Sequence, residues 1–319
     1  MTDHSQLDGR PCFTPDTAAR LLHAWQITAE VSGLDSERDQ NWLVQAGGQP
    51  SHVLKIANRH DGSGLLGLQQ SMMRRLSAAG LPCPAIIPTP AGAWWTEADG
   101  HLAWLITYLP GRRLTDVVPS AVLLDGIGEL VGRAALALAG FDHPAARRRL
   151  QWDVARASQV IGDYRLHVTE PGRRALLDRV LDRYQAQVEP LLGELPSSVI
   201  HNDANDHNLL VSGDTVTGLL DFGDAVRSVT VNDLAIACTY AMLGSSDPAL
   251  TARCVTAGYE RWRLLSAPEH RVLPHLIMTR LATSAAISAY QQTIHPDNAY
   301  LRVSELPAWR LLAWLEPEL

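Results

Sequence analysis

Hydrophobic and polar positions alternate along much of the first hundred residues, and this pattern predicts mainly β-structure. Four segments have strand character, at residues 30–32, 41–45, 52–57 and 102–108. Gly33 and the Gly47-Gly48 pair separate the first three segments, and such short separations predict an antiparallel meander. In the third strand, the alternation places Lys55 on the face opposite Leu54.

Apolar residues at intervals of three and four predict two helices in the same region and several more after residue 114. The first helix begins after the N-cap Thr14, with Pro15 in its first turn. The second carries Leu65 and Leu76 on its apolar face and stops at Gly80. The later predicted helices cover residues 123–138, 149–164, 174–192, 232–242, 249–262 and 274–290.

One β-rich segment interrupts the helical part of the chain. Its strands are expected at residues 199–200, 209–211 and 216–220. The turn Ser212-Gly213-Asp214 lies between the second and third of them and predicts a β-hairpin.

Length and composition fit a globular protein with two lobes. The chain has 319 residues, of which 46% are hydrophobic and 19% charged, so intrinsic disorder is excluded. Pro110-Gly111 breaks the pattern between the β-rich and the helical parts. We therefore expect an α+β fold with an N-terminal lobe over residues 1–108, a hinge over residues 109–113 and a C-terminal lobe over residues 114–319.

Charge and cysteine content restrict the compartment and the partners. The net charge of −7 disfavours a broad basic surface for nucleic acid and suits a neutral or cationic small-molecule substrate. Four cysteines without a CxxC pair predict neither a disulfide framework nor a zinc site, which is typical of the reducing cytoplasm. The longest weakly polar stretch is too short to span a bilayer, so no membrane partner is expected.

The basic residues are almost all arginine, because Lys55 is the only lysine among 27 Lys and Arg residues. Lysine is a compact point charge on a thin stem, whereas arginine is a planar fork. A site that threads one cation through a narrow slot to a phosphate would reject arginine. We therefore expect a functional reason for Lys55.

The residues around the predicted hairpin carry the chemistry. A hairpin that turns at Gly213 brings Asn208, just before its first strand, close to Asp221, just after its second. A carboxylate and an amide oxygen side by side form a hard-oxygen site suited to Mg²⁺. Asp203 precedes Asn208 by five residues and is free to face a substrate hydroxyl.

Three motifs of phosphoryl-transferring kinases occur in the expected order. Val53-Leu54-Lys55 matches the strand lysine that contacts phosphates. His201, Asp203 and Asn208 match the catalytic-loop motif. Asp221-Phe222-Gly223 matches the metal-binding motif. A single motif of this kind is weak evidence, but three in order form a strong signal.

The sequence resembles the aminoglycoside phosphotransferase and choline kinase family, over nearly the whole chain. Within that family it is most similar to hydroxylysine kinases and to the kinase-like domain that some bacteria fuse to class III aminotransferases. The residues that carry the resemblance are Asp39-Gln40-Asn41, Val53-Leu54-Lys55-Ile56, residues 105–111, Asn205-Asp206-His207-Asn208 and residues 218–224.

This resemblance implies a bilobal protein-kinase-like fold and an ATP-dependent, Mg²⁺-dependent phosphotransferase that acts on a small-molecule hydroxyl. It implies that Asp203 handles the hydroxyl proton, that Asn208 and Asp221 bind Mg²⁺, and that residues 106–111 form the adenine-binding hinge. Asp233 would brace the catalytic loop. The nucleotide-binding residues expected from it are Lys55, Asn41, Gln40, Val53 and Tyr108.

The chain departs from the family pattern at three places. The turn over residues 36–41 has no glycine, so polar side chains must replace part of the phosphate cradle. The usual glycine between His201 and Asp203 is Asn202. No acidic residue occurs between Asp61 and Glu97, so Gln69 or Gln70 would hold the strand lysine in place of a helix glutamate. A neutral amide orients a lysine more weakly than a carboxylate does.

Structural explanations compete with catalytic ones for some of these residues. We expect His201 to be a packed residue that shapes the loop rather than a base. His201, Asp203 and His207 could also suggest a metal hydrolase, but such sites need further ligands. Arg147-Arg148-Arg149 is most simply a solvated face. The missing helix glutamate leaves open a non-catalytic nucleotide-binding module.

The acceptor is the least determined part of the prediction. An ammonium group would be bound by carboxylates near Asp203, and the candidates are Asp206, Asp224 and Asp153. A free carboxylate would need an arginine, for which Arg227 is the candidate. Both together suit a hydroxy-amino acid such as 5-hydroxylysine, and the resemblance favours a hydroxy-amino acid or an amino alcohol. An aminoglycoside-type antibiotic kinase is the alternative, and the use of GTP and the oligomeric state stay open.

Overall fold

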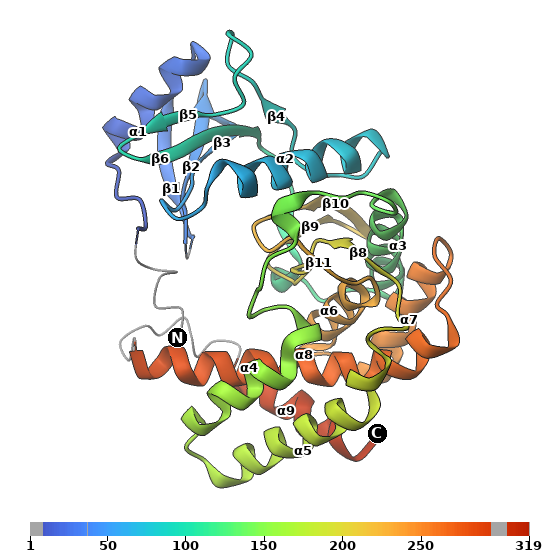
Figure 1. Ribbon diagram of the computed structural model, residues 1–319. Helices are drawn as coiled ribbons and strands as arrows, with labels where there is room; N and C mark the ends of the chain where they lie inside the picture. The colour runs from blue at the N-terminus through green and yellow to red at the C-terminus, as the bar shows by residue number, and fades with distance from the viewer. Residues whose placement is uncertain (1–8, 37, 295–304, 319) are drawn as a thin grey trace. The chain divides into compact units, whose positions relative to one another are not determined.

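The computed structural model describes residues 9–36, 38–294 and 305–318. The chain divides into two compact units, unit 1 (Met1–Pro110) and unit 2 (Gly111–Leu319). The division falls inside residues 109–113, the segment that we assigned to the hinge. Unit 1 is built around an antiparallel sheet and unit 2 is mainly helical, so the predicted α+β class is confirmed (Figure 1).

Unit 1 contains the predicted meander within a larger antiparallel sheet. Its strand order is β1-β2-β3-β6-β4, and β5 pairs with β6. The strands are β1 (Glu30–Leu34), β2 (Gln40–Ala46), β3 (Gln49–Ile56), β4 (Ile86–Ile87), β5 (Thr96–Ala98) and β6 (His101–Thr107). The helices are α1 (Pro15–Leu21), the 3-10 helix η2 (Leu22–Trp25) and α2 (Ser63–Ala78).

Strand alternation decides which side chains of unit 1 form its core. Leu54 and Ile56 of β3 are fully buried and pack with Trp42, Leu105 and side chains of α1 and η2. The N-cap prediction for α1 is confirmed, because the Thr14 hydroxyl accepts a hydrogen bond from the Thr17 N–H. Lys55 therefore lies on the other face of the sheet, as the alternation predicts.

Unit 2 is organised around one long helix, α8, which packs against α4, α5, α6 and α9 (Figure 1). The strands are β7 (Arg112–Arg113), β8 (Ser197–Ile200), β9 (Leu209–Ser212), β10 (Thr215–Leu219) and β11 (Val226–Val229). The α-helices are α3 (Ala121–Ala137), α4 (Ala157–Tyr164), α5 (Pro171–Gln187), α6 (Val231–Met242), α7 (Pro248–Glu260), α8 (Ala267–Ile294) and α9 (Glu305–Leu315). Short 3-10 turns are η3 (Leu114–Asp116), η4 (Pro144–Ala146), η5 (Val154–Arg156), η6 (Arg165–His167), η7 (Glu189–Leu191) and η9 (Glu316–Glu318).

Several elements of unit 2 differ from the prediction. The segment before α4 is not α-helical, because the Asp153 carboxylate caps η5 by accepting from the Ala155 N–H. Helix α8 begins at Ala267 rather than at Pro274, which lies inside it. Strand β11 and helix α9 are additional. Within the described residues, no helix is long and apolar enough to cross a membrane.

Candidate active site

The predicted hairpin of unit 2 is confirmed, and it brings two candidate metal ligands together. β9 and β10 pair antiparallel with Leu209 opposite Leu219. The Leu220 N–H donates to the Asn208 carbonyl at 2.8 Å, which extends the ladder by one step. Asn208 and Asp221 therefore flank the open end of the hairpin.

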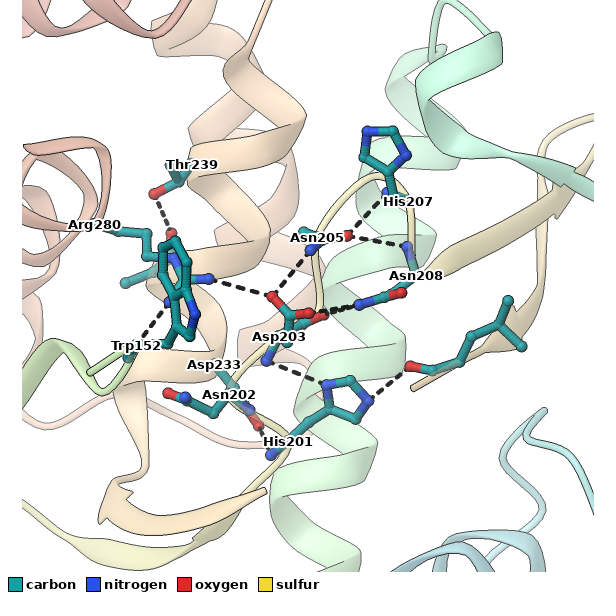
Figure 2. A network of polar contacts seen from close by, with 12 residues as sticks. Trp152, His201, Asn202, Asp203, Asn205, His207, Asn208, Asp233, Thr239 and Arg280 are labelled. Atoms are coloured by element: carbon teal, nitrogen blue, oxygen red, sulfur yellow. Dashed lines mark hydrogen bonds and ion pairs between the residues drawn. The ribbon is translucent and has the colours of Figure 1, made fainter. Parts of the chain in front are cut away.

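The Asp203 carboxylate is held by three side chains (Figure 2). Its Oδ1 accepts from Asn205 Nδ2 at 2.9 Å and from Arg280 Nη2 at 3.2 Å. Its Oδ2 accepts from Asn208 Nδ2 at 2.7 Å. The side chain keeps 21% of its surface exposed. The carboxylate is thus anchored and still open to a substrate.

Asn208 and Asp221 present oxygen atoms of the kind that Mg²⁺ prefers. The Asn208 amide nitrogen is committed to the Asp203 carbonyl at 3.0 Å and to Oδ2, so the amide oxygen is directed elsewhere. The exposed Asp221 has a left-handed φ of 53°, and its Oδ1 accepts from the Gly223 N–H at 3.2 Å. In the described parts of the chain, no three His, Cys, Asp or Glu side chains cluster in a way that could hold a metal. A Mg²⁺ site here would use two protein ligands and complete its shell with water and phosphate oxygens.

Asp233 braces the backbone of the catalytic loop, as expected from the resemblance. Its two carboxylate oxygens accept from the N–H groups of His201 at 2.9 Å and Asn202 at 2.6 Å. Asn202 has a φ of 66°, which explains why a glycine is usual there and why asparagine is tolerated. Burial raises the pKa of Asp233 to about 6.

His201 is a buried structural residue rather than a base. Its Nδ1 accepts from the Asp203 N–H at 3.2 Å, so Nε2 carries the proton and donates to the Leu220 carbonyl at 2.9 Å. Its ring packs edge-on against Phe222, with centroids 4.8 Å apart. Burial lowers the pKa of His201 to about 4, so the imidazole is neutral at physiological pH.

We expect the buried His201 to make stability pH-dependent. Above pH 6.5 the histidine is neutral in both states, and as the pH falls toward 4 only the unfolded state gains the proton. The free energy of unfolding should therefore fall by up to about 3 kcal/mol over this range from this residue alone. Urea unfolding of the wild type and of His201→Asn at pH 7 and pH 5 isolates the contribution. Equal pH dependence in the two proteins would contradict it.

The carboxylates of Asp221 and Asp224 lie within electrostatic reach of Asp203. Burial raises the pKa of Asp203 well above its usual value, the negative charges of Asp224 and Asp221 raise it further, and Arg280 opposes them. The site is therefore negatively charged and suited to cations.

Lys55 is buried on its face of the unit 1 sheet and has an acidic neighbour. Its side chain is 8% exposed, its Nζ lies 3.9 Å from Asp39 Oδ2, and it lies 5.6 Å from the centre of the Trp104 ring. Asn41 and Trp104 are its direct cross-strand partners. The Asn41 amide oxygen is buried and has no hydrogen-bond partner among the described residues.

The sequence leaves open whether Gln69 or Gln70 replaces the missing helix glutamate, and the structure gives Lys55 an acidic partner, Asp39, from the turn before β2. Gln70 donates instead to the Trp94 carbonyl at 3.3 Å. Gln69 has a buried amide oxygen without a hydrogen-bond partner in the described part of the chain. Asp39 belongs to the Asp39-Gln40-Asn41 motif, which was the available signal.

The other nucleotide-site candidates separate by strand face. Val53 shares the face of Lys55 by alternation. Gln40 does not, and we correct its assignment, because its amide accepts from the Phe13 N–H at 2.8 Å and donates to the Phe13 carbonyl at 2.9 Å. The Tyr108 N–H, just after β6, donates to the Ser51 carbonyl at 3.0 Å.

The four substrate candidates have different surroundings. Asp224 lies within electrostatic reach of Asp203. The Asp206 carboxylate is hydrogen-bonded by Thr115. We correct the assignment of Asp153 as a substrate residue. It is 6% exposed and accepts from the Ser228 hydroxyl at 2.6 Å, so it belongs to the interior of unit 2. Arg227 is paired with Asp142 at 2.9 Å.

Sequence reasoning missed two arginines that hold the site. Arg148 donates to the carbonyls of Gly223 and Ala225 and so fixes the segment after Asp221, whereas we expected a solvated face. Arg280 is 2% exposed and contacts Asp203 from α8. It is the only Lys, Arg, Asp or Glu between Arg271 and Asp297, and a single charge in the otherwise uncharged predicted helix over residues 274–290 was the signal for it.

Known structures share this fold. A microcompartment-associated aminopropanol kinase superposes with a TM-score of 0.71 at 17% identity, covering 94% of both chains. A spectinomycin phosphotransferase superposes with a TM-score of 0.67 at 10% identity, covering 95% of both chains. These proteins have the bilobal, protein-kinase-like fold of the aminoglycoside phosphotransferases, so the predicted fold is confirmed.

Sequence relatives cover almost the whole chain. Hydroxylysine kinase of Danio rerio is 30% identical over 94% of this chain and 89% of the relative. Hydroxylysine kinase of Mus musculus is 28% identical over 98% of this chain and 91% of the relative. A homoserine kinase of Rhodopseudomonas palustris (strain HaA2) is 31% identical over 82% of this chain and 79% of the relative. Residues 30–269 match the model of the phosphotransferase enzyme family. The chain therefore belongs to the phosphotransferase enzyme family and is a small-molecule phosphotransferase that acts on a hydroxyl group.

Proposed function

We propose that this protein transfers the γ-phosphoryl group of ATP to the hydroxyl of a hydroxy-amino acid or an amino alcohol. The observation that carries the proposal is the anchored, partly exposed Asp203 carboxylate beside Asn208 and Asp221. Asp203 accepts the proton of the acceptor hydroxyl as its oxygen attacks phosphorus. The residues of the site supply mainly positioning and charge compensation.

We propose that Asn208 and Asp221 hold Mg²⁺. The free amide oxygen and the exposed carboxylate fit a hard cation with few protein ligands. A bound Mg²⁺ neutralises the charge of the transferred phosphoryl group. Arg148 keeps the backbone after Asp221 in place, and Asp233 keeps the loop that carries Asp203 in place.

We assign nucleotide binding to unit 1, as proposed for residues 1–108. Lys55 supplies a buried cation for the phosphates, and the unpartnered Asn41 oxygen and Val53 belong to the same face. We place adenine recognition in the segment that contains Tyr108 and Leu109. Among the described residues, the Leu109 N–H has no hydrogen-bond partner and is available as a donor.

We expect Asp39→Asn to raise the KM for ATP about fivefold with a smaller effect on kcat, since it removes the charge that orients Lys55. Steady-state kinetics against ATP concentration measure the change. Glu97→Gln is the control, because it removes the charge of an exposed carboxylate in β5 of the same unit. An unchanged KM in the Asp39 variant would show that the pair does not orient the lysine.

The acceptor class follows from charge and from the relatives. The carboxylates around Asp203 favour an acceptor with an ammonium group, and Asp224 is the leading residue for it. The hydroxylysine and homoserine kinases among the relatives are named for acceptors that carry an amine, a carboxylate and a hydroxyl. The ion pair between Arg227 and Asp142 leaves the carboxylate ligand of such an acceptor unassigned.

An ADP-release screen tests the proposed function. Purified protein is incubated with MgATP or MgGTP and a panel of hydroxylated amino acids, amino alcohols and aminoglycosides. We expect ADP release and a phosphorylated product with a member of the first two groups. Turnover restricted to aminoglycosides would identify an antibiotic kinase, and nucleotide binding without any product would identify a non-catalytic module.

The cytoplasm is the compartment that we propose. All four cysteines lie in described residues, and none forms a disulfide. Cys83 and Cys238 are buried, and burial raises the pKa of the Cys83 thiol to about 11, so it stays in its unreactive form.

A further inference from the structure

Arg280 contacts the candidate catalytic aspartate from a different part of the chain. It lies in α8, and its guanidinium donates to the Trp152 carbonyl at 2.7 Å and to Asp203 Oδ1 at 3.2 Å (Figure 2). The guanidinium also lies 5.1 Å from the Trp152 ring centre and 5.6 Å from that of Tyr240. The side chain is buried, with 2% of its surface exposed.

The helix that carries Arg280 is itself anchored near this point. The Thr239 hydroxyl of α6 donates to the Ile277 carbonyl of α8 at 3.2 Å, three residues before Arg280. α8 also packs along α4, α5 and α9. The position of the guanidinium is therefore set by the interior of unit 2 and not by the loop that it contacts.

The donors around Asp203 are distributed unequally between its two oxygens. A carboxylate oxygen has about two lone-pair sites. Oδ1 receives Asn205 and Arg280, which fill both sites, whereas Asn208 is the one donor to Oδ2 among the described residues. Oδ2 keeps one site for a further donor, and it contacts Asn208, one of the two proposed metal ligands.

We propose that Arg280 is a positioning residue that saturates Oδ1 of Asp203 and so directs the acceptor hydroxyl to Oδ2. This inference rests on the proposed function. The hydroxyl proton passes to Oδ2 as its oxygen bonds to the γ-phosphorus and the bond from that phosphorus to the bridging oxygen of the leaving ADP breaks. Arg280 itself touches neither substrate nor nucleotide.

The test compares Arg280→Met, which removes all donors, with Arg280→Lys, which keeps a cation but loses the planar fork. We expect kcat to fall about 10²-fold in the methionine variant and less in the lysine variant, with the KM for ATP nearly unchanged. A merely structural role would lower the melting temperature of both variants without this loss of kcat in the folded protein. The crystal structure of the methionine variant should show the Asp203 carboxylate rotated from its wild-type position, because Oδ1 has lost one of its two donors.

Arg263→Lys is the matched control for general destabilisation. Arg263 pairs with the buried Glu269 at 2.7 Å and stacks on Tyr259, but it does not contact Asp203. We expect this variant to lower the melting temperature with little change in kcat.

Two results would overturn the inference. One is an Arg280 variant with wild-type kcat, and the other is an unmoved Asp203 carboxylate in both variant structures. If the wild-type protein phosphorylates no acceptor, the proposed function fails. In that case the role of Arg280 is decided only by the orientation of Asp203 in the crystal structures of the variants. If the methionine variant does not fold, the lysine variant is used for this comparison.

Discussion

Asp203→Ala is expected to lower kcat about 10²- to 10⁴-fold and to leave nucleotide affinity nearly intact, because a positioned general base contributes on this order. The carboxylate is held by Asn205, Asn208 and Arg280, so it is oriented before any substrate arrives. Asp203→Asn should be impaired to a similar degree, since an amide keeps the shape but cannot take the proton. Single-turnover phosphotransfer and nucleotide titration by calorimetry separate the two effects.

Asp214→Ala is the control for the aspartate variants. Asp214 lies at the turn between β9 and β10, accepts from the Ser120 hydroxyl at 2.6 Å and is exposed. Its removal should leave kcat unchanged. If Asp203→Ala retained wild-type turnover, the assignment of the base would be wrong.

The geometry around the hairpin could be predicted from sequence because local rules determine it. A short turn at Gly213 sets the register of the two strands up to Val216, and a β-bulge between Val216 and Gly218 then shifts it by one residue without moving Asn208 and Asp221 from the open end. The positions of Asn208 and Asp221 at the open end could therefore be predicted from the turn. The same holds for Lys55, whose face is set by the period of two along β3.

The error at Gln40 has an equally local cause. We expected the strand to begin at Asn41, which placed Gln40 in the preceding loop with no defined face. β2 begins at Gln40, so alternation sends its side chain toward Phe13 and away from the face of Lys55. An error of one residue in the predicted start of the strand therefore led to the wrong assignment of Gln40.

Contacts between distant segments could not be predicted from the sequence. Arg280 and Asp203 are 77 positions apart, and helical periodicity indicates a buried face without indicating what that face meets. Arg148 reaches across 75 positions to the Gly223 carbonyl for the same reason. Such contacts depend on how helices pack, which a local pattern does not encode.

The second large effect is expected at Lys55. Lys55→Met should lower kcat/KM for ATP about 10²- to 10³-fold, because it removes the only positive side chain that we assign to the phosphates. Lys55→Arg should also be impaired by about tenfold or more despite its kept charge. The lysine is 8% exposed between the Asp39 carboxylate and the Trp104 ring, and a planar fork does not fit where a thin stem is packed.

Steady-state kinetics with ATP as the varied substrate test both Lys55 variants, and circular dichroism confirms that they are folded. Arg59→Lys provides the reverse substitution at an exposed cation of the same unit, where Nη2 donates to the Asp99 carbonyl at 3.1 Å, and it should leave kcat/KM unchanged. Wild-type kcat/KM in Lys55→Arg would mean that charge alone matters at this position. The choice of lysine at this position would then have no functional cause, whereas wild-type kcat/KM in Lys55→Met would mean that other residues bind the phosphates.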